Sequence, residues 1–179
     1  WWGKHGFGPL RENTFGIVLG RDLPVAVTVP TPAAMHALGV ELAGLLRAGD
    51  VIIATGDLGA GKTTLARGIG EGLDVEGPVI SPTFVLSRIH SARGDGPDLV
   101  HVDAYRMADA DELADIDLDE TLSRSVTLVE WGEGIAEWLS DERLEIDIDR
   151  EVGDEARRVI LTGVGPRWDG ALEVIRRKP

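Results

Sequence analysis

The chain has 179 residues, enough for one domain with its own hydrophobic core, and it contains no cysteine, which excludes a disulfide framework and thiolate metal sites. Acidic residues outnumber basic ones by 31 to 18, and the net charge of −13 argues against direct RNA binding, because nucleic-acid binders usually carry a basic face. No apolar run approaches the roughly 20 residues of a membrane span, so we expect a cytoplasmic protein that contacts no membrane. Because of its negative charge, we expect it to reach any RNA only through a partner.

Residues 1–24 differ in character from the rest of the chain. They mix Gly, Pro, Trp and Phe without helical or strand periodicity, and they lack the apolar segment of a signal peptide. We interpret them as an N-terminal extension that is mobile, as chain ends commonly are. The alternative is that Trp1 and Trp2 pack on the body of the protein.

A strand and a helix are predicted next. Residues 25–29 alternate in the manner of an edge strand, and Thr31-Pro32 resembles a helix N-cap followed by proline at the first helical position. Apolar residues then recur at helical spacing, which predicts a helix that runs to about Arg47 and stops before Gly49. The recurring residues, which we expect in the core, are Met35, Leu38, Leu42, Leu45 and Leu46.

Residues 56–63 read G-D-L-G-A-G-K-T, which matches the pattern G-x-x-x-x-G-K-[ST] of a phosphate-binding P-loop. The apolar run 51–54 predicts a buried strand before it, and a helix is predicted over 62–71, as the motif requires. Lys62 would oppose the β- and γ-phosphates, Thr63 would offer a hydroxyl to Mg²⁺, and the helix N-terminus would add partial positive charge. The alternative is an ordinary Gly-rich turn, but the flanking strand and helix favour nucleotide binding.

The rest of the chain alternates predicted strands with predicted helices. Strands are expected over 79–86 (with a break at its proline), 99–103, 126–130, 143–149 and 158–162, the last two pairing antiparallel across a polar turn near Gly153. Helices are expected over 108–123, 134–139 and 167–177. This alternation predicts a three-layer α/β, P-loop NTPase-like fold with a mixed, mainly parallel sheet, in which residues 25–179 form a single ATPase domain.

Two acidic residues follow predicted strands directly. Asp103 ends the strand 99–103 and Glu130 ends the strand 126–130. Either could be an ordinary strand-end residue, but a P-loop site needs an acidic partner for Mg²⁺, and parallel strands end at the same edge of a sheet. We therefore expect one acid to hold the metal and the other to orient or activate water, without a preference between them.

Asp103 belongs to a longer pattern, H-x-D-x-Y-R. Along a strand, His101, Asp103 and Tyr105 would share one face. A lone histidine is more often structural than catalytic. Arg106 could reach a phosphate or pair with one of the many carboxylates, and the spacing favours neither.

Four motifs follow one another in a specific order along the chain. They are G-D-L-G-A-G-K-T-T at 56–64, S-P-T-F at 81–84, H-x-D-x-Y-R at 101–106 and E-W-G-E at 130–133. Many families share the P-loop, whereas the ordered set is much more specific. Over about residues 25–162 the chain resembles the TsaE (YjeE) family, small bacterial ATPases of tRNA threonylcarbamoyladenosine synthesis.

The resemblance implies a function as well as a mixed α/β P-loop fold. A TsaE-like protein joins a TsaB–TsaD pair, in which TsaD transfers threonylcarbamoyl to adenosine 37 of tRNAs that read codons beginning with A. Binding and hydrolysis of ATP, with Mg²⁺, would support repeated turnover rather than the transfer itself. Activity is expected to be weak without the partners, and the protein alone is expected to be a monomer or a weak oligomer.

The resemblance also assigns roles to individual residues. Lys62 would bind phosphates and act in catalysis with Asp103 and Glu130, while Thr63 and Glu130 would bind Mg²⁺ with Asp103 near the metal and the γ-phosphate. Further nucleotide contacts are expected from Asp57, Leu58, Gly59, Ala60, Gly61, Thr64 and Trp131. Ser81 and Thr83 resemble a nucleotide-sensing switch, and the remaining site residues are His101, Tyr105 and Arg106.

Two other functions fit a P-loop chain. A small-molecule kinase would usually bring a lid with several arginines to the γ-phosphate, and the polar loop 91–97 offers only Arg93, with Arg88 nearby. A nucleotide-gated binding protein would lack meaningful hydrolysis, and Asp103 and Glu130 argue against that alternative.

Overall fold

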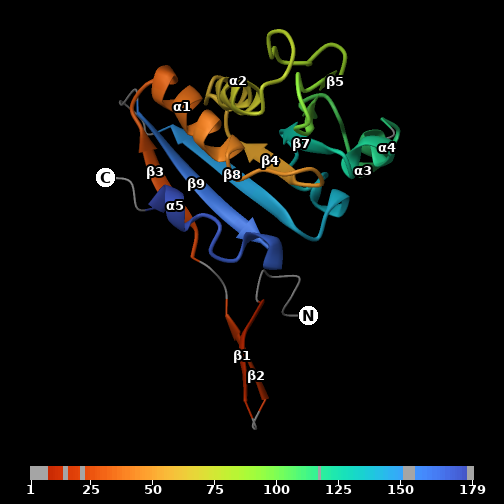
Figure 1. The fold of residues 1–179 in the computed structure, drawn as a ribbon. Coiled ribbons are helices and arrows are strands. Elements are labelled where there is room, and N and C mark those ends of the chain that lie inside the picture. The colour runs from red at the N-terminus through yellow and green to blue at the C-terminus, as the bar shows by residue number, and fades with distance from the viewer. Residues whose placement is uncertain (1–7, 14–15, 21–22, 117, 151–155, 177–179) are drawn as a thin grey trace.

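The computed structural model describes residues 8–13, 16–20, 23–116, 118–150 and 156–176 (Figure 1). Its body is a seven-stranded sheet in the order β3-β9-β8-β4-β7-β6-β5. In chain order these strands are β3 (Val25–Val29), β4 (Val51–Thr55), β5 (Ser87–His90), β6 (Asp98–Asp103), β7 (Ser125–Glu130), β8 (Arg143–Arg150) and β9 (Arg157–Val164). The helices are α1 (Pro32–Ala43), α2 (Lys62–Gly72), α3 (Ala110–Ala114), α4 (Asp119–Leu122) and α5 (Glu173–Arg176), with single 3₁₀ turns η2 (Glu137–Leu139) and η3 (Pro166–Trp168).

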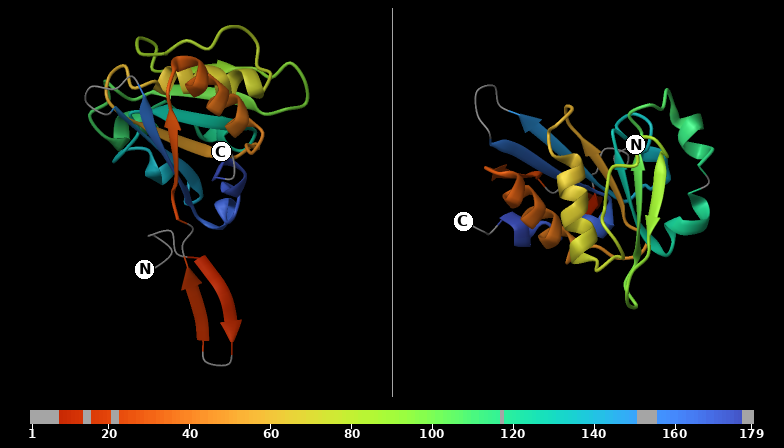
Figure 2. Two further views of the ribbon diagram at one scale, coloured as in Figure 1. Left: turned by 90° about the vertical axis from the view of Figure 1, so that its left-hand side faces the viewer. Right: turned by 90° about the horizontal axis from the view of Figure 1, so that it is seen from above.

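Helices cover the sheet on both sides, which confirms the predicted three-layer α/β fold. Figure 2 shows α1 and α2 on one side of the sheet and α3 and α4 on the other. Strand β4 is buried on both faces: Ile52 and Ala54 join the core under α1 and α2, whereas Val51 and Ile53 join the opposite core. No helix in the described part of the chain is both long and apolar enough to cross a bilayer.

Most strands of the sheet run in one direction. The pairings β8–β4, β4–β7 and β7–β6 are parallel, while β3–β9, β9–β8 and β5–β6 are antiparallel. Strands β3, β8, β4, β7 and β6 therefore share one direction and β9 and β5 oppose it, which confirms a mixed, mainly parallel sheet. The carboxyl ends of β4, β7 and β6 meet at one edge, because Ala54 pairs with Glu130 and Glu130 with Asp103. The P-loop leaves β4 at this edge.

Helix α2 carries the P-loop and packs closely against α1. A Cβ atom at Gly68 would lie 2.0 Å from the carbonyl oxygen of His36, and one at Gly39 would lie 2.4 Å from that of Leu65. Only glycine permits this approach of the two backbones. The predicted cap of α1 is present, since the Thr31 hydroxyl accepts a hydrogen bond from the Ala34 N–H at 3.1 Å. The helix ends at Ala43, four residues earlier than predicted.

The strand predicted over 79–86 is wrong. These residues form an irregular loop with a turn, in which the N–H groups of Val85 and Leu86 both donate to the Pro82 carbonyl. Leu86 has a φ of 65°, a left-handed conformation that a strand does not contain. The strand of this region is β5, which begins at Ser87 and pairs antiparallel with β6.

The single helix predicted over 108–123 is also wrong. The chain forms α3, capped by the Asp109 side chain, and then the separate short helix α4. Leu113 and Leu118 are both buried, but residues five apart lie far from each other around a helix. The break lets both leucines enter the core. The helix predicted over 167–177 is confirmed only over α5, and the 3₁₀ turn η3 stands at the start of that region instead.

The antiparallel pair near the C-terminus is confirmed. Strands β8 and β9 pair from Arg143 with Val164 to Arg150 with Arg157, and the predicted turn near Gly153 lies outside the described residues. At the other end of the chain, β1 (Gly8–Asn13) and β2 (Gly16–Gly20) form a separate antiparallel sheet that the sequence did not predict. Trp1 and Trp2 lie outside the described residues, and the mobility of the extension stays a prediction.

Candidate nucleotide-binding site

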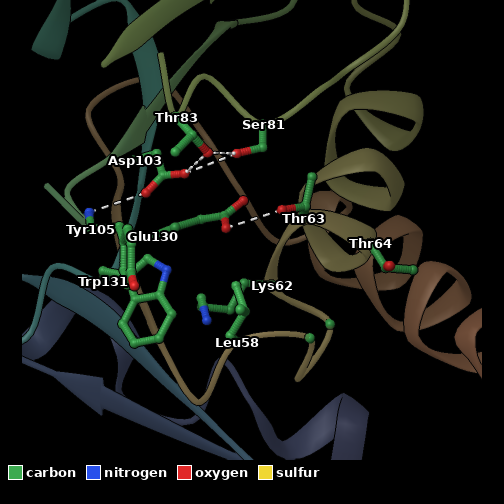
Figure 3. A pocket seen from close by; sticks show the side chains of 12 residues that line it. Leu58, Lys62, Thr63, Thr64, Ser81, Thr83, Asp103, Tyr105, Glu130 and Trp131 are labelled. Carbon is green, nitrogen blue, oxygen red and sulfur yellow. Dashed lines mark hydrogen bonds between the residues drawn. The ribbon is translucent and has the colours of Figure 1, made fainter. Parts of the chain in front are cut away.

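A cavity of about 270 Å³ lies at the sheet edge where β4, β7 and β6 end. Its lining comes from the P-loop with the start of α2, from the loop before β5, and from the ends of β6 and β7 (Figure 3). The lining residues are Leu58, Gly59, Gly61, Lys62, Thr63, Thr64, Ser81, Thr83, Asp103, Tyr105, Glu130 and Trp131. Every one of them belongs to the set of site residues predicted from the sequence.

The glycines give the P-loop its shape. Gly56, Gly59 and Gly61 have φ values of 142°, 78° and 120°, which other residues rarely adopt. A Cβ atom at Gly56 would also lie 2.5 Å from the carbonyl oxygen of Ile148 on β8. The loop thus curves back over the end of the sheet and leads directly into α2.

Two predicted P-loop contacts lie outside the lining of this cavity. Asp57 is exposed, and its side chain lines a different pocket beside β8. Ala60 is buried and lies next to a cavity of about 80 Å³ on the other side of the loop. That cavity also includes Thr31, Met35 and Arg157, none of which the sequence marked as a site residue. Arg157 Nε donates to the carbonyl oxygen of Ala60 at 3.3 Å, and no local pattern could have placed it beside a loop 97 residues away.

Lys62 is almost fully buried at the centre of the site, with 4% of its surface exposed. Its ammonium donates to the carbonyl oxygens of Gly56 and Asp57, the latter at 3.0 Å, and lies 3.6 Å from the centre of the Trp131 ring. Burial lowers the pKa of Lys62, and the carboxylates of Glu130, Asp103 and Asp57 oppose that shift. The neighbouring carboxylates therefore favour the charged form that a phosphate would attract.

Glu130 connects the end of β7 to the P-loop helix. Its Oε2 accepts a hydrogen bond from the Thr63 hydroxyl at 3.1 Å, across 67 residues of sequence. Its Oε1 lies 2.8 Å from Nε2 of His101, a fully buried side chain on the neighbouring strand β6. Glu130 itself is only 3% exposed, so its carboxylate is held from two sides within the protein.

Asp103 connects the end of β6 to the loop that precedes β5. Its Oδ2 accepts hydrogen bonds from the hydroxyls of Ser81 at 2.9 Å and Thr83 at 2.5 Å, and these two hydroxyls are 2.6 Å apart. Its Oδ1 accepts from the backbone N–H of Tyr105 at 3.1 Å. Figure 3 shows this cluster on the same side of the sheet edge as Glu130 and Thr63. Ser81 and Thr83 thus attach the S-P-T-F segment to the strand-end acid.

Aromatic side chains form the remaining wall. Trp131 has a φ of 62°. The centres of the Trp131 and Tyr105 rings are 5.1 Å apart, and the planes of the two rings make an angle of 54°. Tyr105 follows the end of β6 and is half exposed. Arg106 does not line the cavity, and its guanidinium lies over the ring of Phe84, 4.8 Å from the ring centre. This contact is neither the phosphate contact nor the carboxylate pair that the sequence suggested for Arg106.

The donor set fits a nucleotide with Mg²⁺. A hydroxyl and carboxylates are oxygen ligands of the kind that Mg²⁺ prefers, and this ion commonly takes one or two carboxylates together with substrate phosphates. Thr63, Glu130 and Asp103 supply those groups, and Lys62 with the amino end of α2 supplies positive charge for phosphates. Within the described residues, no group of three or more His, Cys, Asp or Glu side chains could hold a metal by itself.

Comparison with known proteins identifies the family. The model of the family described as "Threonylcarbamoyl adenosine biosynthesis protein TsaE" matches residues 29–159. The chain belongs to the TsaE family. The matched region of this TsaE family member contains every residue that lines the cavity.

Named relatives support the same assignment. A tRNA threonylcarbamoyladenosine biosynthesis protein TsaE of Streptomyces coelicolor is 59% identical over 138 residues, which cover 75% of this chain and 93% of the relative. The protein of that name from Bacillus subtilis is 41% identical over 148 residues, 82% of this chain and 90% of the relative. The crystal structure of YdiB from Bacillus subtilis matches with a TM-score of 0.70 and 35% identity, over 87% of this chain and 95% of that chain.

Proposed function

We propose that this TsaE family member is a Mg²⁺-dependent ATPase that supports threonylcarbamoyl transfer to adenosine 37 of tRNA by a TsaB–TsaD-like pair. The names of its relatives support the pathway, and the P-loop cavity supports the use of a nucleotide. The observation that carries the proposal is the hydrogen bond between Thr63 on the P-loop helix and Glu130 at the end of β7. It joins a hydroxyl and an acid of the kinds that hold Mg²⁺ in P-loop NTPases.

Each polar residue of the cavity has a role in this proposal. Lys62 would bind the β- and γ-phosphates, and Thr63 and Glu130 would hold Mg²⁺, which neutralises phosphate charge when it is bound. Asp103 would orient water near the γ-phosphate, since its carboxylate faces the same cavity. Trp131 would pack beside the nucleotide. The hydroxyls of Ser81 and Thr83, bonded to Asp103, would make the conformation of their loop depend on what occupies the cavity.

The charge of the protein supports an indirect role toward RNA. With a net charge of −13, the chain would repel the phosphate backbone of a tRNA. A partner that holds the tRNA removes the need for a basic face on this subunit. The kinase alternative loses support, because Arg93 of the loop 91–97 pairs with Asp74 at 3.2 Å and lines a different cavity.

Binding of ATP, measured by calorimetry with Mg²⁺ and with EDTA, tests the proposed site. The wild-type protein should bind ATP more tightly with Mg²⁺, and Lys62→Ala should abolish binding. Arg124→Ala is a matched control, because it removes the same charge from an exposed position just before β7, at the end opposite Glu130. Equal affinity of Lys62→Ala and Arg124→Ala would refute the proposal.

A further inference from the structure

His101 is the most deeply buried titratable residue near the cavity, yet it does not line it. Its side chain has no exposed surface, and it projects from β6 two residues before the strand-end acid Asp103. Its ring reaches across to β7, where Nε2 lies 2.8 Å from Oε1 of Glu130. A polar ring in this position contacts no nucleotide, so its effect on the site must pass through Glu130.

The two oxygens of Glu130 have different partners. Oε1 is bonded to His101 inside the sheet, and Oε2 is bonded to the Thr63 hydroxyl at the cavity. One bond at each oxygen restricts rotation of the carboxylate about its terminal torsion, which is otherwise broad. The plane of the carboxylate is therefore restricted from both sides, and on the side away from the cavity it is the histidine that holds it.

The hydrogen-bonding pattern determines which ring nitrogen donates. A carboxylate only accepts, so Nε2 of His101 must carry the proton in this bond. Nδ1 is buried and has no hydrogen-bond partner within the described residues. The bond to Glu130 therefore uses the Nε2–H of His101 as its donor.

We propose that His101 is a positioning residue, whose Nε2–H orients the Glu130 carboxylate so that Oε2 and the Thr63 hydroxyl together face Mg²⁺. The inference rests on the proposed function for the identity of the metal. Its geometric part, the directed hydrogen bond from His101 to Glu130, stands independently of any nucleotide. Partners that orient metal-binding side chains commonly change metal affinity by about 10–100-fold when they are removed.

Two variants separate the hydrogen bond from the bulk of the ring. In His101→Gln, the side-chain amide N–H₂ can occupy the place of Nε2 and still donate to Glu130. His101→Leu keeps a buried side chain but removes the donor. His90→Leu is the matched control. His90 is also buried, and it lies on the adjacent strand β5. Among the described residues, its side chain makes no hydrogen bond to Glu130.

The first measurement uses nitrogen NMR of the histidine rings without nucleotide or metal. His101 should show a proton on Nε2, and Glu130→Gln should shift its Nε2 resonance more than Glu133→Gln does. An Nε2 that carries no proton, or an Nε2 resonance that does not respond to Glu130→Gln, would overturn the proposal. Because no ligand is present, this result does not depend on the proposed function.

The second measurement is the gain in ATP affinity that Mg²⁺ provides, taken as the ratio of dissociation constants in EDTA and in Mg²⁺. His101→Leu should reduce this gain about tenfold or more while it leaves the EDTA value unchanged, whereas His101→Gln and His90→Leu should keep the wild-type gain. A folded His101→Leu protein with the wild-type gain would overturn the positioning role. If the wild-type protein binds no ATP, the proposed function fails, and the NMR result alone decides the His101–Glu130 bond.

Discussion

Replacing Arg167 by leucine should destabilise the protein by about 3 kcal/mol, because it would leave a buried carboxylate without its main partner. The Arg167 guanidinium donates to both oxygens of Asp50, at 2.9 and 2.7 Å, and to the carbonyl of Leu45 at 2.7 Å. The side chains of Arg167 and Asp50 are only 11% and 4% exposed. This pair joins the turn η3 to the loop that precedes β4.

The magnitude follows from what remains after the substitution. Breaking a buried ion pair by removing one partner costs about 3–5 kcal/mol. Asp50 would keep the hydrogen bond that its Oδ2 accepts from the Arg47 N–H at 2.9 Å. The Arg47 side chain would compensate only weakly, because it is 67% exposed and its Nε lies 3.9 Å from Asp50 Oδ1. This partial compensation favours the lower end of the range. For a chain of this size, about 3 kcal/mol corresponds to a fall in Tm of about 6–12 °C.

Thermal unfolding of Arg167→Leu, followed by circular dichroism, measures this effect. Arg124→Leu is the control, since it removes an exposed arginine and should change stability by less than about 0.5 kcal/mol. Adding Asp50→Asn to Arg167→Leu should recover part of the loss, because the buried charge that lost its partner is then removed. ATP affinity well below Tm should stay unchanged, since the pair lies at the opposite end of β4 from the P-loop. A fall in Tm of less than about 2 °C would refute the reasoning.

Two further predictions concern stability. Gly68→Ala should cost at least about 2 kcal/mol in urea unfolding, because its Cβ would lie 2.0 Å from the His36 carbonyl oxygen and must push α1 and α2 apart; a neutral effect would contradict the close packing. Asp147→Asn should stabilise the protein at neutral pH by less than about 1 kcal/mol, since burial, followed by repulsion from Glu133, Glu145 and Asp149, raises the pKa of this partly exposed carboxyl. The folded state then binds the Asp147 proton more tightly than the unfolded state, so the contribution of Asp147 to stability falls as pH rises above 3.8. The advantage of the variant in Tm should therefore shrink as the pH is lowered toward that value. A gap in Tm that widens on acidification would show that the sign is wrong.

The P-loop part of the cavity lining and the two strand-end acids could be predicted because their evidence is local, whereas Ser81, Thr83 and Trp131 were predicted only through the family resemblance. The P-loop is defined by spacing, and the strand ends at Asp103 and Glu130 are marked by apolar runs that stop at an acid. Parallel strands then bring those ends to one edge, which the registers of β4, β7 and β6 confirm. These inferences need only the fold class and the direction of the strands.

The contacts between those residues could not be predicted, because they depend on strand order and loop conformation. His101 reaches Glu130 only because β6 lies next to β7, a neighbour relation that no local pattern contains. The segment 79–86 carries a strand-like composition, but Pro82 and the hydrogen bonds of Ser81 and Thr83 to Asp103 hold it in a loop. Tertiary contacts thus override the local preference.

The most direct test of the central claim is ATP hydrolysis by the full chain, alone and with a TsaB–TsaD-like pair and tRNA. Hydrolysis should be weak alone, rise with the partners, and disappear in Lys62→Ala but not in Arg124→Ala. Modification of tRNA should then continue through many rounds only with the wild-type and Arg124→Ala proteins. Repeated modification with Lys62→Ala, or hydrolysis that the partners do not change, would contradict the account.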